Sequence, residues 1–362
     1  MIRSDSPANI VFKRALITTI TLSCVSISAE GLSVKQWENI TDGLIENRSV
    51  NELAVKKTTI NEQNIKFIIK IIKNNSRIRT LRVEDTKIES DLVIELLGEA
   101  ISNNKNIQRF AFLGNRVSAA RMMSLHEFIK FNASITALEM TYLTATPELS
   151  HSFQQLFRHN PRISALRLRL GIFPWPRTKK YSFGNLTKLE LDCVKIENSC
   201  AQRFCETLKK NKNLRELKLH WSLSEEDNDV QLLADLLEVN LTLKHLSIVE
   251  YLDDDVADRL IKSLPYNKTL KSLTIRIDEL DVLKKFSEYL QHNQSIRSIE
   301  LDVDDQHLVD NMHILAPLLS NNTSITQLST PISSACVADL FRSLKFNTTL
   351  SQLKFTTYNR SF

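Results

Sequence analysis

The chain has 362 residues, of which 42% are hydrophobic and 25% charged, as in an ordinary soluble protein, and its 6 Gly and 8 Pro argue against collagen-like or low-complexity segments. No run approaches the ~18 consecutive apolar residues that a membrane span needs, so no membrane partner is expected. The net charge of +5 is unevenly divided, because residues 1–185 hold 26 Lys/Arg against 16 Asp/Glu, whereas residues 186–362 hold 21 against 26.

A six-residue pattern, apolar-x-x-apolar-x-apolar, recurs along the chain. Most copies lie 25 to 29 residues apart, and the exceptions are 33 residues before Val50 and 23 before Leu186. The alternation predicts a short strand with one buried face. In the second half of each repeat, apolar residues at steps of three and four predict a helix. The copies begin at Ile17, Val50, Ile78, Ile107, Ile135, Ile163, Leu186, Leu214, Leu243, Leu270, Ile296, Ile325 and Leu350.

The junction between each helix and the next strand reads apolar-x-x-Asn-x-x-apolar. Asn tolerates a left-handed backbone better than other non-Gly residues, so we expect it to end each helix in that conformation. Seven of these Asn residues stand in Asn-x-Ser/Thr triplets, which the repeat pattern explains without glycosylation. The eleven cap residues are Asn47, Asn75, Asn104, Asn132, Asn160, Asn211, Asn240, Asn267, Asn293, Asn322 and Asn347.

Stacking such repeats curves the chain, because strands lie ~4.7–4.9 Å apart whereas helices are ~10 Å wide. We therefore predict an α/β solenoid, a horseshoe with a parallel β-sheet on the concave face and α-helices on the convex face. The strand motif and the roughly 28-residue period resemble the ribonuclease-inhibitor-like class of leucine-rich repeat proteins. That class places Asn or Cys in the turn after the strand. Asn115 matches this rule, whereas Thr58, Thr86 and Val194 do not.

We expect residues 1–14 to be an N-terminal cap or flexible segment, residues 15–349 a solenoid of about twelve repeats, and residues 350–362 a terminal strand and tail. Lys13-Arg14 and the apolar stretch after it also resemble a secretory signal. The rival interpretation is a first strand, Ile17-x-x-Ile20-x-Leu22 with Ile27 five residues later. Interspersed Thr and Ser residues favour this strand.

The sixth repeat lacks a cap Asn, and Pro174 and Pro176 exclude a regular helix. We predict a loop over residues 171–185 in its place. Trp175 lies there among basic residues and is a candidate partner contact, because aromatic and Arg side chains anchor interfaces. The alternative is a degenerate repeat whose aromatic side chains fill the gap left by the helix.

The strand positions between the apolar ones face the concave side, and charged residues follow them. Arg residues occupy the middle strands, and acidic residues occupy a later strand. With Trp175, the candidate partner-binding residues are Arg82, Arg109, Arg167, Arg169, Lys218, His220, Glu300 and Asp302.

Catalytic and cofactor motifs are absent from the sequence. It has no glycine-rich phosphate loop and no HExxH motif, and its scattered cysteines lack CxxC spacing. His220 and His245 lie on adjacent predicted strands, but no nucleophile accompanies them. We therefore expect no enzyme activity, no metal and no cofactor. The odd number of cysteines, five, indicates a reduced compartment.

The resemblance implies a recognition module, such as an adaptor, an inhibitor or an effector of an intracellular bacterium. We expect a monomeric scaffold that binds a protein partner through the concave face or the 171–185 loop. The expected location is the cytoplasm, with secretion into a host cell as an alternative. The other functional hypothesis is nucleic-acid binding through the basic N-terminal half, although Glu52, Glu84 and Glu139 lie among its concave residues.

Overall fold

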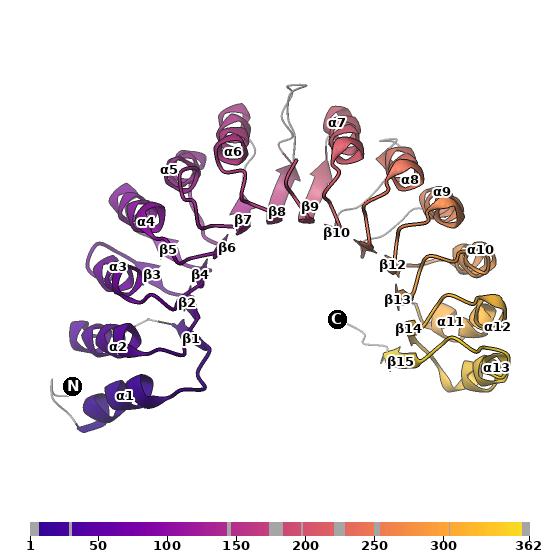
Figure 1. Ribbon diagram of the computed structural model, residues 1–362, viewed down its shortest axis with the longest axis horizontal. Helices are drawn as coiled ribbons and strands as arrows, with labels where there is room; N and C mark the ends of the chain where they lie inside the picture. Colours follow the sequence, from indigo (N-terminus) through magenta and orange to yellow (C-terminus); the bar gives the residue numbers. More distant parts are fainter. Residues whose placement is uncertain are drawn as a thin grey trace. The chain divides into compact units, whose positions relative to one another are not determined.

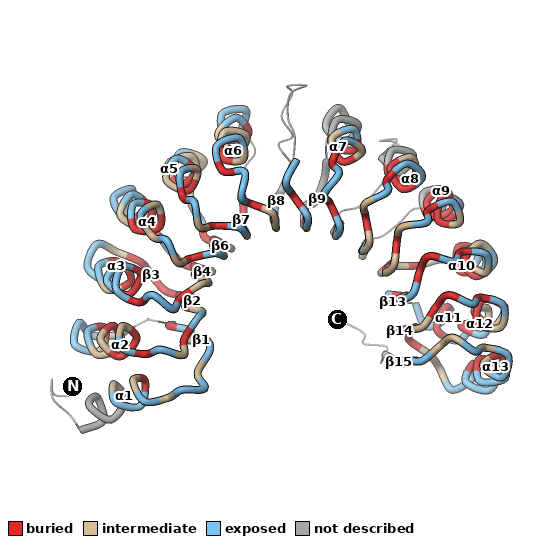
Figure 2. Tube along the Cα trace, viewed as in Figure 1, coloured by how far each residue is buried: buried red, intermediate tan, exposed pale blue. Residues whose placement is uncertain are grey.

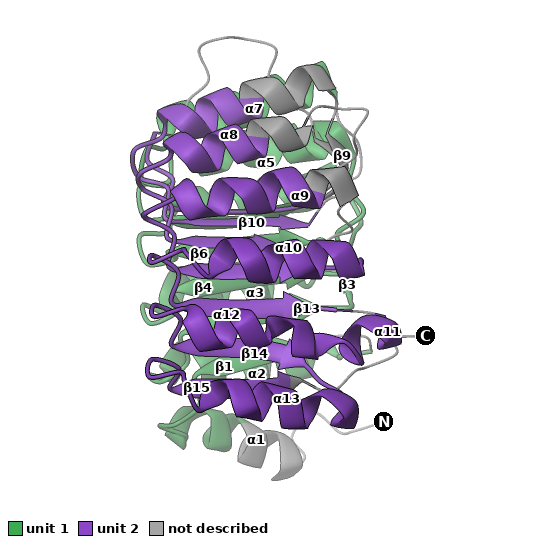
Figure 3. Ribbon diagram, turned by 90° about the vertical axis from the view of Figure 1, so that its right-hand side faces the viewer, with its two compact units in different colours: residues 1–176 green, residues 177–362 purple. Residues whose placement is uncertain are grey.

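The computed structural model describes residues 7–28, 31–142, 146–173, 184–196, 198–220, 229–249, 254–303 and 305–356. The chain forms two compact units, residues 1–176 and 177–362 (Figure 3). We call them unit 1 and unit 2 and describe each by itself. In both, strands of a parallel sheet alternate along the chain with helices, and the helices lie on the outer side of the sheet (Figure 1). Each unit is thus an arc of an α/β leucine-rich repeat solenoid.

Unit 1 holds six described strands of the parallel sheet in chain order, and a short second sheet of two strands beside them. The main strands are β1 (Cys24–Ile27), β2 (Glu52–Lys56), β4 (Thr80–Glu84), β6 (Arg109–Leu113), β7 (Ala137–Tyr142) and β8 (Ala165–Phe173), and the short ones are β3 (Thr59–Ile60) and β5 (Lys87–Ile88). The helices are α1 (Pro7–Thr18), α2 (Val34–Glu46), α3 (Ile65–Asn74), α4 (Asp91–Asn103), α5 (Ala119–Ile129) and α6 (Pro147–His159).

Unit 2 repeats the arrangement with seven described strands in chain order. They are β9 (Lys188–Ile196), β10 (Glu216–His220), β11 (His245–Ile248), β12 (Ser272–Arg276), β13 (Ser298–Asp302), β14 (Gln327–Pro331) and β15 (Gln352–Thr356). The helices are α7 (Asn198–Lys210), α8 (Asp229–Val239), α9 (Asp254–Ser263), η2 (Leu264–Tyr266), α10 (Leu280–Leu290), α11 (Gln306–Val309), η3 (Met312–Leu315), α12 (Ala316–Asn321) and α13 (Ser334–Leu344).

The core of each unit lies between the sheet and its helices, as the buried positions in Figure 2 show. On β4, Leu81 and Val83 are fully buried, and Ile68, Ile71 and Ile72 of α3 form the facing helical stripe. Each such side chain contributes about 1.5–3 kcal/mol on leaving water. The two periodicities read from the sequence therefore correspond to one continuous apolar layer.

The cap Asn residues stack the repeats on one another. The side-chain amide of Asn75 donates to the carbonyl oxygen of Leu44 at 2.6 Å, in the preceding repeat. Its Oδ1 accepts from the backbone N–H groups of Arg77 at 2.7 Å and Ile78 at 3.1 Å, which begin the next strand. Asn132 and Asn322 make the same bonds.

The expectation of left-handed cap residues is wrong. Asn75 has φ −93° and ψ 114°, which is extended backbone, and the non-Gly residues with positive φ in the described chain are Lys57 and Asp85. Asn is required for its amide, which donates and accepts at once inside the core. Conformational tolerance plays no part at these positions.

The strand predicted from Ile17 to Leu22 is also wrong. Residues up to Thr18 belong to α1, Ile20 is 86% exposed, and the strand begins at Cys24. Two matches to the apolar pattern overlap at Leu22, and the strand follows the later one, Leu22-x-x-Val25-x-Ile27. Asn47 donates to the carbonyl oxygens of Leu16 and Thr19, so Thr19 stands where later repeats have the cap Asn. The boundary expected after residue 14 falls inside α1.

The predicted 171–185 loop begins too early. β8 continues through Gly171 to Phe173, so these residues belong to the strand. Residues 174–183, with Trp175, lie outside the described residues.

Candidate functional site

Four charged side chains from consecutive strands meet on the concave face of unit 1. The register places Arg82 on β4, Glu139 on β7 and Arg167 on β8 in one row across the sheet, with Arg109 of β6 two positions earlier along its strand. Glu139 lies at the centre, with its Oε2 3.6 Å from Arg82 Nη2 and 3.9 Å from Arg167 Nη1. Its Oε1 lies 3.8 Å from Arg109 Nη1. We call these four residues the concave arginine cluster.

Exposure divides the cluster into a buried floor and an open surface. The side chains of Glu139 and Arg82 are 11% and 19% exposed, whereas those of Arg167 and Arg109 are 36% and 53% exposed. The carboxylate therefore orients two guanidinium groups that still face solvent. Such groups bind carboxylates and phosphates through paired hydrogen bonds.

A second carboxylate fixes Arg82. Its Nη2 lies 2.5 Å from Glu84 Oε1, and Lys56 Nζ lies 2.8 Å from the other oxygen. Burial acts to raise the pKa of Glu84, but the hydrogen bonds from Lys56 and Arg82 outweigh it and hold that pKa below its usual value. Glu84 is thus ionised at neutral pH, and Arg82 acts as a support for the cluster.

The candidate residues of unit 2 do not form one site. Lys218 on β10 lies 3.6 Å from Glu216 and His220 is half-buried, whereas Glu300 and Asp302 are exposed on β13. Strands β11 and β12 separate the two pairs, a distance of about 14 Å at the usual strand spacing.

Other candidate residues fall outside this cluster. Arg169 is exposed on β8 of unit 1, and Trp175 lies outside the described residues. His220 and His245 are on adjacent strands, but the register pairs His245 with Glu216, four positions from His220. The prediction of adjacent strands is confirmed, but the register does not bring the two histidines together.

Unit 1 also holds a buried polar group that is not among the residues predicted from the sequence. His126 of α5 is fully buried, with its Nε2 2.9 Å from Tyr142 Oη and its Nδ1 3.0 Å from Ser152 Oγ. A signal was present, because His126 lies beside Met122 and Leu125 on the apolar stripe of its helix. A polar residue on such a stripe needs an internal partner.

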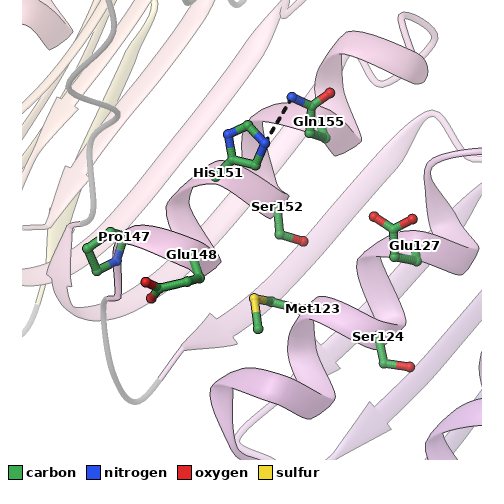
Figure 4. A pocket seen from close by; sticks show the side chains of 8 residues that line it. All are labelled: Met123, Ser124, Glu127, Pro147, Glu148, His151, Ser152 and Gln155. Carbon is green, nitrogen blue, oxygen red and sulfur yellow. Dashed lines mark hydrogen bonds between the residues drawn. The ribbon is translucent and has the colours of Figure 1, made fainter.

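Ser152 connects this buried group to a groove between α5 and α6. The groove has a volume of about 640 Å³, and Figure 4 shows the side chains that line it. A serine beside a histidine resembles a nucleophile with its base. However, burial lowers the pKa of His126 to about 3, so the imidazole is a poor proton acceptor at neutral pH. The arrangement stabilises the packing of α5 on α6. The lining residues are Met123, Ser124, Glu127, Pro147, Glu148, His151, Ser152 and Gln155.

The described residues contain no group of three or more His, Cys, Asp or Glu side chains placed to hold a metal ion. No helix in the described part of the chain has the length and apolar character needed to cross a bilayer.

Comparisons with known proteins identify the fold. No protein-family model and no curated protein matches the chain. It is similar to a chain in the structure of the yeast Rad7 and Elc1 complex, with a TM-score of 0.52 and 12% identity over 95% of this chain and 78% of that one. A Bacteroides fragilis protein matches with a TM-score of 0.44 and 13% identity, over 88% and 77% of the two chains. The tropomodulin C-terminal domain of Caenorhabditis elegans gives 0.35 and 16%, over 43% and 92%. The likeness to the yeast chain is one of fold, and the repeats are of the leucine-rich type.

Proposed function

We propose that this chain is a non-enzymatic scaffold that binds a protein partner on the concave face of unit 1, at the concave arginine cluster. One observation carries the proposal. Arg109 and Arg167 are both oriented by a buried carboxylate on a rigid parallel sheet, and both keep more than a third of their side-chain surface exposed. Pre-oriented Arg side chains contribute strongly to protein interfaces, because little conformational entropy is lost on binding.

The absence of enzyme activity is part of the proposal. Ser152 and His126 are a serine–histidine pair within hydrogen-bond reach in unit 1, and the depressed pKa of that histidine argues against proton transfer. The cluster itself lies on an open sheet surface, which does not exclude water as a catalytic cleft does.

The wider biological role is proposed by analogy. The repeats fit the ribonuclease-inhibitor-like class, and the chain would act alone as an adaptor, an inhibitor or a bacterial effector. A cytoplasmic location, or delivery into a host cytoplasm, is consistent with the free cysteines Cys24, Cys205 and Cys336. In the yeast structure of the same fold, Rad7 is found in a protein complex, which supports a protein partner by analogy only.

A capture experiment tests the site. The wild type and the variant Arg109→Glu/Arg167→Glu are immobilised and exposed to the same cell extract, with Lys66→Glu/Lys87→Glu as a matched control on exposed positions outside the concave face. We expect a protein retained by the wild type and the control but lost from the arginine variant. Equal retention by all three would place the site elsewhere.

Nucleic-acid binding is the competing outcome. This outcome would be duplex DNA that binds the wild type, with an affinity that falls steeply with salt, but does not bind the arginine variant. The partner would then be a nucleic acid and not a protein. The two carboxylates Glu84 and Glu139 beside the arginines favour the protein.

A further inference from the structure

The turns that lead from each cap Asn into the next strand form one edge of each unit. Because the strands within a unit are parallel, all of these turns lie at the edge where the strands begin. We define the junction rim of a unit as the first, second and fourth residues after each of its cap Asn residues. The third residue is the apolar one that enters the core.

The junction rim is basic in both units. Over the eleven junctions its positions hold eleven Lys or Arg residues and no Asp or Glu, although the whole chain has nearly equal numbers, 47 and 42. Six of the eleven belong to unit 2, whose sequence carries more acidic than basic residues. The eleven are Arg48, Arg77, Arg79, Lys105, Arg162, Lys212, Arg215, Lys244, Lys268, Lys271 and Arg297.

Neither the helix dipole nor ion pairing explains this bias. The dipole of a helix favours cations in its last turn, but these residues lie beyond the helix ends. Within the described parts of the chain none of the eleven forms an ion pair, in contrast to the arginines of the concave cluster. Four of them reach a rim carbonyl instead, for example Arg215 Nη1 to Thr242 O at 3.2 Å and Arg297 Nη1 to Ser324 O at 2.9 Å. Their charge is therefore not neutralised by neighbouring carboxylates.

Apolar side chains project beside these cations in unit 2. Val239, Leu241 and Tyr266 flank two successive cap Asn residues and are 57%, 75% and 71% exposed. The two turns lie against each other, because the amide of Asn267 donates to Leu237 O at 2.6 Å and the hydroxyl of Thr269 to Asn240 O at 3.3 Å. We call these three exposed side chains, which lie on two turns joined by these hydrogen bonds, the apolar patch of unit 2.

We propose that the junction rim of unit 2 docks on an anionic lipid bilayer. Lys212 and Lys268 would contact the phosphate and carboxylate headgroups, while Leu241 and Tyr266 enter the interface between headgroups and acyl chains. A bilayer surface suits a projecting patch, because it needs no groove of complementary shape. A phosphodiester backbone offers the aliphatic side chains nothing apolar, so the patch favours lipid over nucleic acid. The earlier expectation of no membrane partner rests on the lack of a spanning segment, which surface docking does not need.

Co-sedimentation of the full chain with vesicles tests the proposal. The vesicles are phosphatidylcholine alone or phosphatidylcholine with phosphatidylserine, at low and high salt. We expect binding to the phosphatidylserine vesicles that weakens at high salt, because the screening length falls from about 10 Å at 0.1 M to about 3 Å at 1 M. Lys212→Gln/Lys268→Gln should lower the partition coefficient roughly 30-fold, at about 1 kcal/mol per charge.

Two further variants separate the rim from net charge. Leu241→Ser/Tyr266→Ser should lower the partition coefficient by at least about tenfold without a change in charge. Lys66→Gln/Lys87→Gln removes two exposed lysines away from the rim and should leave binding unchanged. Equal loss in this control, equal binding to both kinds of vesicle, or no binding would overturn the proposal. Rim-dependent binding of duplex DNA without vesicle binding would also overturn it.

Discussion

Replacing a single cap Asn tests how the repeats are held together. Asn75 and Asn74 are neighbours of the same type with opposite roles. Asn75 is 3% exposed and bonds to two repeats, whereas Asn74 is exposed and donates to Lys70 O of its own helix. We predict that Asn75→Ala destabilises the protein strongly and that Asn74→Ala does not.

The size of the effect follows from the groups left without partners. In Asn75→Ala, the backbone N–H of Ile78 and the carbonyl oxygens of Leu44 and Asn47 lose a hydrogen bond inside the core. A buried polar group without a partner costs about 1–3 kcal/mol. The N–H of Arg77 also loses its bond to Asn75, but it is only partly buried, so water replaces that bond. We therefore expect a loss of about 3 kcal/mol.

Urea denaturation followed by circular dichroism measures both variants against the wild type. The midpoint should fall for Asn75→Ala, while Asn74→Ala should stay within about 0.5 kcal/mol of the wild type, as for other surface changes. If Asn75→Ala also stays within that limit, the bonds between repeats do not hold the solenoid together, and apolar packing alone does.

Two further predictions concern unit 1. Burial lowers the pKa of His126 from 6.5 to about 3. Between these two values the unfolded chain binds a proton at this residue and the folded chain does not. The contribution of the neutral imidazole to the free energy of unfolding is therefore present above pH 6.5 and is lost as the pH falls towards 3. Between pH 6.5 and 5 the wild type should lose about 2 kcal/mol more than His126→Leu in urea titrations, and equal losses would contradict the burial of a neutral imidazole. Gly98→Ala in α4 should lower the melting temperature, because the added methyl group overlaps the ring of Phe128. Overpacking of this kind costs about 1–3 kcal/mol, which exceeds the roughly 1 kcal/mol by which Ala is a better helix former than Gly. The control Ser102→Ala, at a half-buried position of the same helix, should leave the melting temperature nearly unchanged.

The apolar periodicity predicted the fold well. The alternating residues of each strand and the residues at steps of three and four in each helix can be buried together only when the helices pack on one face of a parallel sheet. The sheet on the concave face and the helices on the convex face follow from residues such as Leu81 and Ile72, whose positions the pattern predicts. The first strand was misplaced because Leu22 fits two overlapping matches, and no sequence rule identifies Thr19 as the counterpart of a cap Asn. The hydrogen bonds that identify it join residues about 30 positions apart in the sequence.

The candidate site was predictable only in part. Alternation along the strands placed Arg82, Arg109 and Arg167 on one face, and the repeat pattern places Arg82, Glu139 and Arg167 at the same position of their copies, in agreement with the observed register. The convergence of the three arginines on Glu139 also depends on their side-chain conformations, which the sequence alone does not give. The buried hydrogen bonds of His126 could not be predicted, because they join α5 to Ser152 of α6 and to Tyr142 of β7. The basic residues of the junction rim can be read from the sequence, whereas the lack of ion pairs to them among the described residues needs coordinates.

Site-specific photo-crosslinking tests the central claim most directly. A photoreactive amino acid is placed at Ala137, the register partner of Arg109 on the concave face of unit 1, and in a parallel sample at Lys66 on the exposed side of α3. If the concave face is the binding surface, irradiation in cell extract yields a discrete protein adduct from position 137 and none from position 66. Adducts from position 66 alone, or the same adducts from both positions, would contradict the proposed site.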